Sequence, residues 1–276
     1  MGATADDRAV REFLAGIHVG DICGGTVVEV TRSREVMVTL DGFSARPLGT
    51  VRPADVSWRW KTAEAVEVGR RITAEVVAVD PDGGRVRLAM TATENPELWA
   101  FLTSRQPGEV LSGTVAAIER FGVFVSLDDG PDHPVFPGVG FITIPELSWR
   151  RIEAASDVVA VGQRVSCVFF RFDTWNLEAR LSLRAMWPDP FQEFADRTPV
   201  GRCLDGPVTK LVPFGAFVRV ADGIEGLVPL EELAWTPVER AQDVVEVGEE
   251  ISVVATEIDR MRRRLALSRR QASPPG

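Results

Sequence analysis

The fold is decided by residues 205–235, which read DGPVTKLVPFGAFVRVADGIEGLVPLEELAW. Apolar residues alternate after Gly206, and Phe214-Gly215-Ala216-Phe217 places two aromatic rings three residues apart beside a glycine. The chain then turns at Ala221-Asp222-Gly223 and resumes as Gly226-Leu227-Val228. Alternation broken by glycines and by one short polar turn predicts a β-hairpin with a bulge or bend at its glycines.

The same stretch occurs twice more, earlier in the chain. Residues 113–149 repeat the ring pattern as Phe121-Gly122-Val123-Phe124, and residues 25–58 repeat the frame without the rings. Each copy ends on a tryptophan, namely Trp58, Trp149 or Trp235. The period of roughly 90 residues is much longer than a solenoid repeat and long enough for each copy to bury a core of its own. The repeat therefore predicts three tandem domains.

Each copy continues in the same order after its tryptophan. A polar stretch leads to Val-Gly, then to a strand-like run that ends in aspartate, then to a loop and a closing run with an arginine at its start. The aspartates are Asp80, Asp173 and Asp259, and the arginines are Arg85, Arg180 and Arg264. Five short strands with one helical segment between the third and the fourth follow the order of a small Greek-key barrel. We therefore expect an all-β fold of three tandem five-stranded barrels joined by short helical linkers.

The expected bounds follow from this frame. The segments are an N-terminal helix (1–17), three domains (18–93, 106–186 and 198–270), two linkers (94–105 and 187–197) and a tail (271–276). In the first domain we expect strands near 20–30, 35–40, 47–52, 71–79 and 84–90, and a helical turn near 53–66. Trp99 and Phe101 of the first linker should pack on a neighbouring domain.

Composition sets the broad class of protein. The 276 residues are 45% hydrophobic and 26% charged, which is typical of a soluble globular chain. No apolar run approaches the roughly 20 residues that a membrane-spanning helix needs. The start, Met1 to Asp7, is polar and acidic and does not resemble a signal peptide, so we expect a cytoplasmic protein with no membrane association.

The sequence offers no metal, cofactor or catalytic site. Cys23, Cys167 and Cys203 form no CxxC pair and the chain has only two histidines, so neither zinc nor a disulfide framework is expected, and the cysteines should be buried apolar residues. His133 stands alone in the proline-rich insertion 131–137, a stiff loop, and is interpreted as a surface residue. No nucleophile accompanies a base and no glycine loop could cradle phosphate, so we expect a protein that is not an enzyme.

The charge balance is relevant to nucleic-acid binding. A formal net charge of −9 argues against a general binder of polyanions. Single-stranded nucleic acid can still bind an acidic protein, because the stacking of bases on aromatic rings does not depend on net charge.

The sequence of the third copy resembles the S1 domain, an OB-fold module that is repeated in bacterial ribosomal protein S1 and found in other RNA-handling proteins. The resemblance rests on Phe214 to Val218, Glu225 to Pro229, and Glu257 to Asp259 before Arg264 to Ser268. It covers roughly residues 18–270, strongly in the third copy, well in the second and mainly through the frame in the first. In that family two hairpin aromatics, a histidine after the third strand, and an Asp and an Arg beside the last hairpin line the RNA face. Carried over, the resemblance implies RNA contacts by Phe214, Phe217, Asp259 and Arg264 in the third domain and by Phe121, Phe124, Asp173 and Arg180 in the second.

The chain departs from the family pattern in two ways. Arg52, Thr143 and Pro229 stand at the histidine position, so that contact is absent or replaced in each domain. The first domain has Arg34 and Met37 where the rings would stand. We therefore expect it to dock on protein, including the ribosome, or to buttress the second domain, with Arg34 and Arg52 leaving a weaker electrostatic role open.

The residues themselves support the same interpretation and leave some alternatives open. The glycine between the two rings permits a bend that brings both to one face, although one ring of each pair could instead be core. Lys210 and Arg219 could contact phosphates, as could the arginine cluster 260–264, whose alternative is a solvated hairpin loop. The three repeated tryptophans are interpreted as core or linker anchors rather than stacking rings, whereas Trp175 is the more credible exposed ring.

We therefore expect a non-catalytic binder of single-stranded RNA that acts in translation or RNA metabolism, with bases stacked on phenylalanines of the barrel face. Its second and third domains would carry the RNA. The alternative is a protein-interaction adaptor or ribosome-associated regulator whose barrels contact protein.

Overall fold

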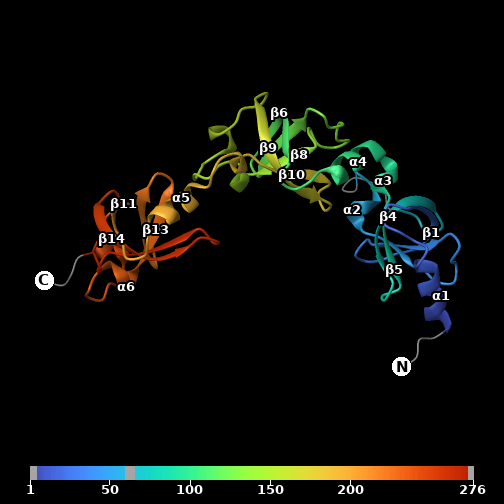
Figure 1. Cartoon of the computed structure of the whole chain (residues 1–276), viewed down its shortest axis with the longest axis horizontal. Helices are drawn as coiled ribbons and strands as arrows, with labels where there is room; N and C mark the ends of the chain where they lie inside the picture. The colour runs from blue at the N-terminus through green and yellow to red at the C-terminus, as the bar shows by residue number, and fades with distance from the viewer. Residues whose placement is uncertain (1–4, 60–65, 273–276) are drawn as a thin grey trace. The chain divides into compact units, whose positions relative to one another are not determined.

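The computed structural model describes residues 5–59 and 66–272. They form three five-stranded sheets, and in each the strands pair in a ring that closes into a barrel. Figure 1 shows the strands of each barrel and the helices that join them. The predicted all-β class with three tandem barrels and helical linkers is confirmed, while the exact domain bounds given above remain predictions.

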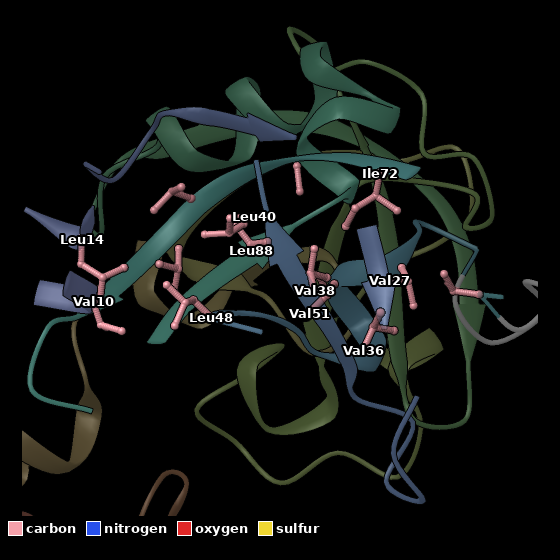
Figure 2. Close-up of a cluster of buried hydrophobic side chains, with 14 residues drawn as sticks. Val10, Leu14, Val27, Val36, Val38, Leu40, Leu48, Val51, Ile72 and Leu88 are labelled. Atoms are coloured by element: carbon pink, nitrogen blue, oxygen red, sulfur yellow. The ribbon is translucent and has the colours of Figure 1, made fainter. Parts of the chain in front are cut away.

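The first barrel follows an amphipathic N-terminal helix. Val10 and Leu14 of that helix are buried in the barrel core together with valines and leucines from all five strands (Figure 2), so the helix packs on the first barrel. The predicted helical turn near 53–66 is short, and its residues 60–65 lie outside the described part of the chain. The elements are α1 (Ala5–Leu14), β1 (Ile22–Val30), β2 (Val36–Leu40), β3 (Gly49–Val51), α2 (Pro53–Val56), β4 (Arg71–Asp80) and β5 (Arg85–Ala89).

The first linker is helical and leads into the second barrel. Asn95 caps its longer helix by accepting a hydrogen bond from the N–H of Leu98, and a proline stands in the first turn. The elements are α3 (Thr91–Glu94), α4 (Pro96–Ser104), β6 (Val110–Glu119), β7 (Gly122–Leu127), β8 (Gly140–Thr143), η1 (Ile144–Glu146), η2 (Ala155–Asp157), β9 (Arg164–Asp173), β10 (Glu178–Ser182) and η3 (Arg184–Met186).

The third barrel is preceded by the second helical linker. Asp189 caps that helix through the N–H of Phe191, whose ring is buried in the core of the third barrel. The elements are α5 (Pro190–Arg197), β11 (Cys203–Val212), β12 (Gly215–Ala221), β13 (Ile224–Pro229), α6 (Leu230–Leu233), η4 (Ala241–Asp243), β14 (Glu250–Asp259) and β15 (Arg264–Ser268).

The described residues form two compact units. Unit 1 holds the first and second barrels and ends at Leu183, except that the segment Ser148–Glu153 belongs to unit 2 with the third barrel. Within unit 1, Phe172 of the second barrel stacks on Trp58 with ring centroids 6.5 Å apart and meets the edge of Trp99 at 5.5 Å. Trp99 therefore packs on a neighbouring barrel, as predicted.

The register of the last hairpin corrects one equivalence drawn from the sequence. In the third barrel Asp259 lies opposite Arg264, whereas in the second barrel Asp173 lies opposite Glu178, two residues before Arg180. The interpretation of Arg180 and Arg264 as equivalent is therefore wrong. The two hairpin loops have the same length, and loop length fixes which residues pair, whereas the Arg-apolar-x-apolar pattern can be matched at either position.

The cysteines and the repeated tryptophans follow the predictions only in part. Cys167 is buried, and burial raises the pKa of its thiol to about 12, but Cys23 is half-buried and Cys203 is exposed. Trp58 is buried, as expected of a core anchor, whereas Trp235 is 54% exposed. The expectation of burial is therefore correct for Cys167 and Trp58, and it is wrong for Cys203 and, as a core residue, for Trp235.

Candidate nucleic-acid interface

The outer face of the third barrel carries a row of neighbouring side chains across four strands. Phe217 on β12 lies opposite Leu227 on β13, which lies opposite Ala266 on β15, which lies opposite Glu257 on β14. All four are half-buried or exposed, whereas the residues that alternate with them on β12, β13 and β15 are buried. The row forms an apolar floor with one acidic end.

The second ring of the pair, Phe214, stands at the edge of this floor. It lies in the tight turn between β11 and β12 and is 59% exposed, while Phe217 is half-buried. A Cβ at Gly215 would come within 2.1 Å of the carbonyl oxygen of Val228, so only glycine allows β12 to approach β13 so closely at this point. Gly215 thus lets Phe214 and Phe217 share one face, as the sequence predicts.

A groove of about 670 Å³ opens over this floor. It brings together four of the predicted contact residues, because Phe214, Phe217, Asp259 and Arg264 all line it. Its two walls are the β12–β13 hairpin and the β14–β15 hairpin, and both walls contribute polar side chains. The other lining residues are Glu225, Leu227, Pro229, Glu257, Arg262, Arg263, Leu265 and Ala266.

The arginine cluster at the mouth of the groove is divided in its roles. Arg260 is ion-paired with Asp196 at 2.6 Å, and Arg263 is ion-paired with Asp189 at 2.5 Å, so both hold the loop against α5. Arg264 is exposed and has no ion pair within the described residues, and the guanidinium of Arg262 lies 3.9 Å from the carboxylate of Asp259. Two arginines of the cluster, Arg260 and Arg263, are therefore held by protein carboxylates, whereas Arg264 is accessible to a phosphate.

Lys210 and Arg219 extend the face beyond the groove. Lys210 on β11 lies opposite Phe217, and Arg219 follows Phe217 by two residues on β12, so both point outward on the same side of the sheet. Both are exposed, and neither is among the residues that line the groove. They place two positive charges along the edge of the apolar floor.

The equivalent face of the second barrel is covered by the chain itself. Phe121 is 56% exposed, but Phe124 is only 6% exposed. The ring of Phe136, from the proline-rich insertion, stacks on Phe124 with centroids 5.3 Å apart and planes inclined by 23°. Of the two predicted stacking rings in this barrel, therefore, one is open and the other is already stacked.

His133 anchors the covering loop. Its Nδ1 accepts hydrogen bonds from the N–H groups of Val135 (3.1 Å) and Phe136 (3.0 Å), and its Nε2 lies 3.1 Å from the carbonyl oxygen of Leu177. Its ring also stacks on Phe136 with centroids 4.7 Å apart. The interpretation of His133 as a surface residue is wrong, because the side chain is 7% exposed. Burial lowers its pKa to about 4, although the Leu177 carbonyl favours the protonated form.

The charged pair of the second barrel is also engaged internally. Arg180 donates to Asp173 at 2.8 Å and to Glu178 at 3.1 Å, and its guanidinium lies 5.0 Å from the ring centroid of Phe141. Burial would raise the pKa of Asp173, but hydrogen bonds from Arg180, from the Asn176 side chain and from backbone N–H groups hold it below its usual value. Asp173 and Arg180 are thus mutually satisfied, with side chains 11% and 19% exposed.

The first barrel has no ring on its outer row. Met37, Thr50 and Arg87 are the cross-strand neighbours there. Arg52 pairs with the buried carboxylate of Asp55 at 2.6 Å and donates to the Thr174 hydroxyl of the second barrel at 3.3 Å. Arg52 is therefore held by protein groups, whereas Arg34 remains exposed in the β1–β2 turn.

Sequence reasoning missed two kinds of residue at these faces. Leu227 completes the apolar floor of the third barrel, and Phe136 covers the face of the second. The signal for Phe136 was available, because it is an aromatic residue inside a stiff proline-rich insertion that the third barrel lacks. Trp175 is 61% exposed, as the sequence predicts.

Within residues 5–59 and 66–272, no group of three or more His, Cys, Asp or Glu side chains could hold a metal ion. None of the helices in that part of the chain is long and apolar enough to span a membrane.

The comparison with protein families decides the classification. The model of the S1 RNA binding domain matches residues 104–184 and 197–270, which together make up more than half of the chain. The chain belongs to the S1 RNA-binding domain family. The matched ranges contain the second and third barrels of the chain, and the first barrel lies outside both.

Several curated relatives of the chain carry one common name. The chain is 37% identical over 254 residues to the small ribosomal subunit protein bS1 of Mycobacterium tuberculosis and 40% identical over 254 residues to that of Mycobacterium leprae; each alignment covers 90% of this chain and 50% of the relative. The corresponding protein of Neisseria meningitidis is 32% identical over 265 residues, with 94% of this chain and 43% of the relative covered. The chain thus spans about half the length of the curated relatives it matches.

Proposed function

We propose that this S1-family protein is a non-catalytic binder of single-stranded RNA that acts in translation, and that the groove of the third barrel is its principal RNA site. The observation that carries the proposal is the groove itself, where an exposed ring, a half-buried ring and an exposed arginine line one apolar floor. The family match and the names of the relatives support RNA and the ribosome as partners.

The chemistry of the groove suits a single-stranded base. Bases stack on Phe214 and Phe217, each contact contributing about 1 to 3 kcal/mol, and the stacking does not depend on sequence. Arg264 and Lys210 are placed to contact phosphates on either side of the rings, and Asp259, with Glu225, offers carboxylate acceptors for base or ribose N–H and O–H groups. Binding is therefore expected to be modest for one barrel and tolerant of sequence.

The second barrel contributes less in this arrangement. Phe121 is open to a base, but Phe124, Asp173 and Arg180 are engaged by protein groups. The third barrel therefore carries most of the RNA affinity, and contacts by the second are secondary.

A docking role for the first barrel has a separate basis. Its outer row has no ring, its Arg52 is held by Asp55 and Thr174, and Phe172 of the second barrel packs on Trp58 and Trp99. These contacts favour a buttress for the second barrel, with protein rather than RNA as the partner of any exposed surface.

The test is a titration of fluorescent single-stranded RNA at several salt concentrations. The wild-type protein should bind with a log-log slope of about −0.7 per phosphate contact. The Phe214→Ala/Phe217→Ala variant should lose at least about thirtyfold in affinity, because two stacking contacts are removed. Val247→Ala is the matched control, since this exposed valine precedes β14 at the end away from the groove. Absence of wild-type binding at low salt would overturn the proposal and favour the protein-interaction adaptor.

A further inference from the structure

The segment Ser148–Glu153, here called the strap, lies against the third barrel. In the sequence it follows η1, the short helical turn after β8 of the second barrel. Two guanidinium groups contact the Trp149 ring, that of Arg184 at 4.2 Å from the ring centroid and that of Arg263 at 4.4 Å. The indole N–H of Trp149 donates to the carbonyl oxygen of Trp187 at 3.1 Å. Trp149 is thus held by three contacts within unit 2.

The strap also reaches the other hairpin of the groove. Arg150 donates to the carboxylate of Asp222 at 2.5 Å in the β12–β13 turn, and its side chain passes beside Gly223. β13 and β15 are parallel, with Leu227 opposite Ala266, so the turn before β13 and the loop before β15 lie at the same end of the barrel. One short segment therefore contacts both hairpins that wall the groove, at the end where both walls begin.

The residue that Trp149 holds has a backbone that needs support. Arg263 has φ 52°, in the left-handed region, which is unfavourable for a residue with a side chain. Its guanidinium is stabilised by Asp189 and by the rings of Trp149 and Phe191. Arg262 and Arg264 flank it directly and line the groove. The orientation of these two groove arginines therefore depends on how firmly Arg263 is held.

From these contacts we infer that the strap is a positioning element of the third-barrel groove, with Trp149 as its main positioning residue and Arg150 as a minor one. Trp149 fixes Arg263 by cation–π contact and so presents Arg262 and Arg264 to an RNA phosphate without itself touching the RNA. The Arg150–Asp222 pair is exposed on both sides, so its own contribution is small. This inference rests on the proposed function, and it extends the support of the RNA site to residues outside the third-domain range.

Two measurements on the full chain test the strap. Amide hydrogen exchange reports on the loops directly, and Trp149→Ala should make exchange at residues 260–264 about tenfold faster. RNA titration should show about threefold to tenfold weaker binding for the same variant and a salt slope flatter by about 0.7, the value of one phosphate contact. Trp149→Phe keeps a ring beside the guanidiniums and should restore most of the affinity. Arg150→Ala should weaken binding by less than about twofold, like its matched control Arg240→Ala, another exposed ion-paired arginine of unit 2.

The outcomes separate this inference from the proposed function. Unchanged exchange in Trp149→Ala, or faster exchange with unchanged RNA affinity and slope, would overturn the strap inference alone. RNA binding that survives Phe214→Ala/Phe217→Ala would overturn the groove assignment, and absence of wild-type binding would overturn both. Weakening by Trp149→Phe equal to that by Trp149→Ala would also count against a ring–guanidinium contact.

Discussion

The second and third barrels carry the same pair of phenylalanines in the same hairpin, and the two pairs have different surroundings. In the third barrel Phe214 is exposed and Phe217 is half-buried over an open groove. In the second barrel Phe121 is exposed, but Phe124 is buried beneath Phe136. The difference lies in the turn after the second strand, which is short in the third barrel and is replaced by a proline-rich insertion in the second. A motif ring is therefore accessible in an open groove or buried under another ring according to a loop outside the motif.

The largest effect that tests this comparison is on stability. Phe124→Ala removes a buried ring and should lower the free energy of unfolding of unit 1 by about 3 to 5 kcal/mol, with RNA affinity changed by less than about twofold at temperatures where the protein is folded. Phe217→Ala should do the reverse, weakening RNA binding with a much smaller loss of stability, because its ring is on an outer face. Chemical denaturation and RNA titration of both variants check the pair. Equal stability losses would contradict the difference in burial.

Low pH should destabilise the loop that His133 anchors over the face of the second barrel. The pKa of His133 is about 4 in the folded protein and 6.5 in a free side chain, so the unfolded chain takes up a proton first as pH falls. The contribution of the neutral His133 to the free energy of unfolding is therefore fully present above pH 6.5, declines between pH 6.5 and about pH 4, and is lost below about pH 4. The total change is about 3 kcal/mol or less. Denaturation of the wild type and of His133→Gln across this window isolates the residue, because other acidic groups are common to both. Identical pH dependence in the two proteins would contradict the buried, neutral His133.

A smaller effect on RNA affinity is expected when the covered face of the second barrel is opened. Phe136→Ala removes the ring that stacks on Phe124, so a base can take its place, and RNA affinity should rise by about threefold to tenfold as two barrels engage one strand. Val135→Ala is the matched control, because this valine lies in the same loop and is 45% exposed. Titration with an RNA long enough to reach both barrels measures the change. Unaltered affinity would show that the second face is closed by more than Phe136.

Much of the fold could be predicted from the sequence, because the same order of strands is repeated three times along the chain. The strands expected near 20–30 and 71–79 are β1 and β4 with shifts of at most two residues. The error lay in β10, where the Arg180 pattern fits two positions and loop length selects the one with Glu178 opposite Asp173. A local pattern identifies a strand but does not fix its register, because register depends on the turn before it.

The candidate site was predictable to a lesser degree. Phe214, Phe217, Asp259 and Arg264 could be nominated together through the resemblance to the S1 domain, and all four line one groove although they come from two hairpins. The burial of His133 and the position of Trp149 could not be predicted, because both depend on where a loop folds back, and no periodicity encodes that. Contacts between segments that are distant in the sequence decided which nominated residues remain accessible.

The measurement that tests the central claim most directly compares two rings at equivalent turn positions. Phe214 and Phe121 are exposed to nearly the same extent, 59% and 56%, so replacing either with alanine perturbs folding to a similar degree. Single-stranded RNA titration of Phe214→Ala and Phe121→Ala should show a loss of about tenfold for the first, as expected for one stacking contact, and less than about threefold for the second. Equal losses, or a larger loss for Phe121→Ala, would contradict the account that the third barrel is the open RNA face and the second is covered.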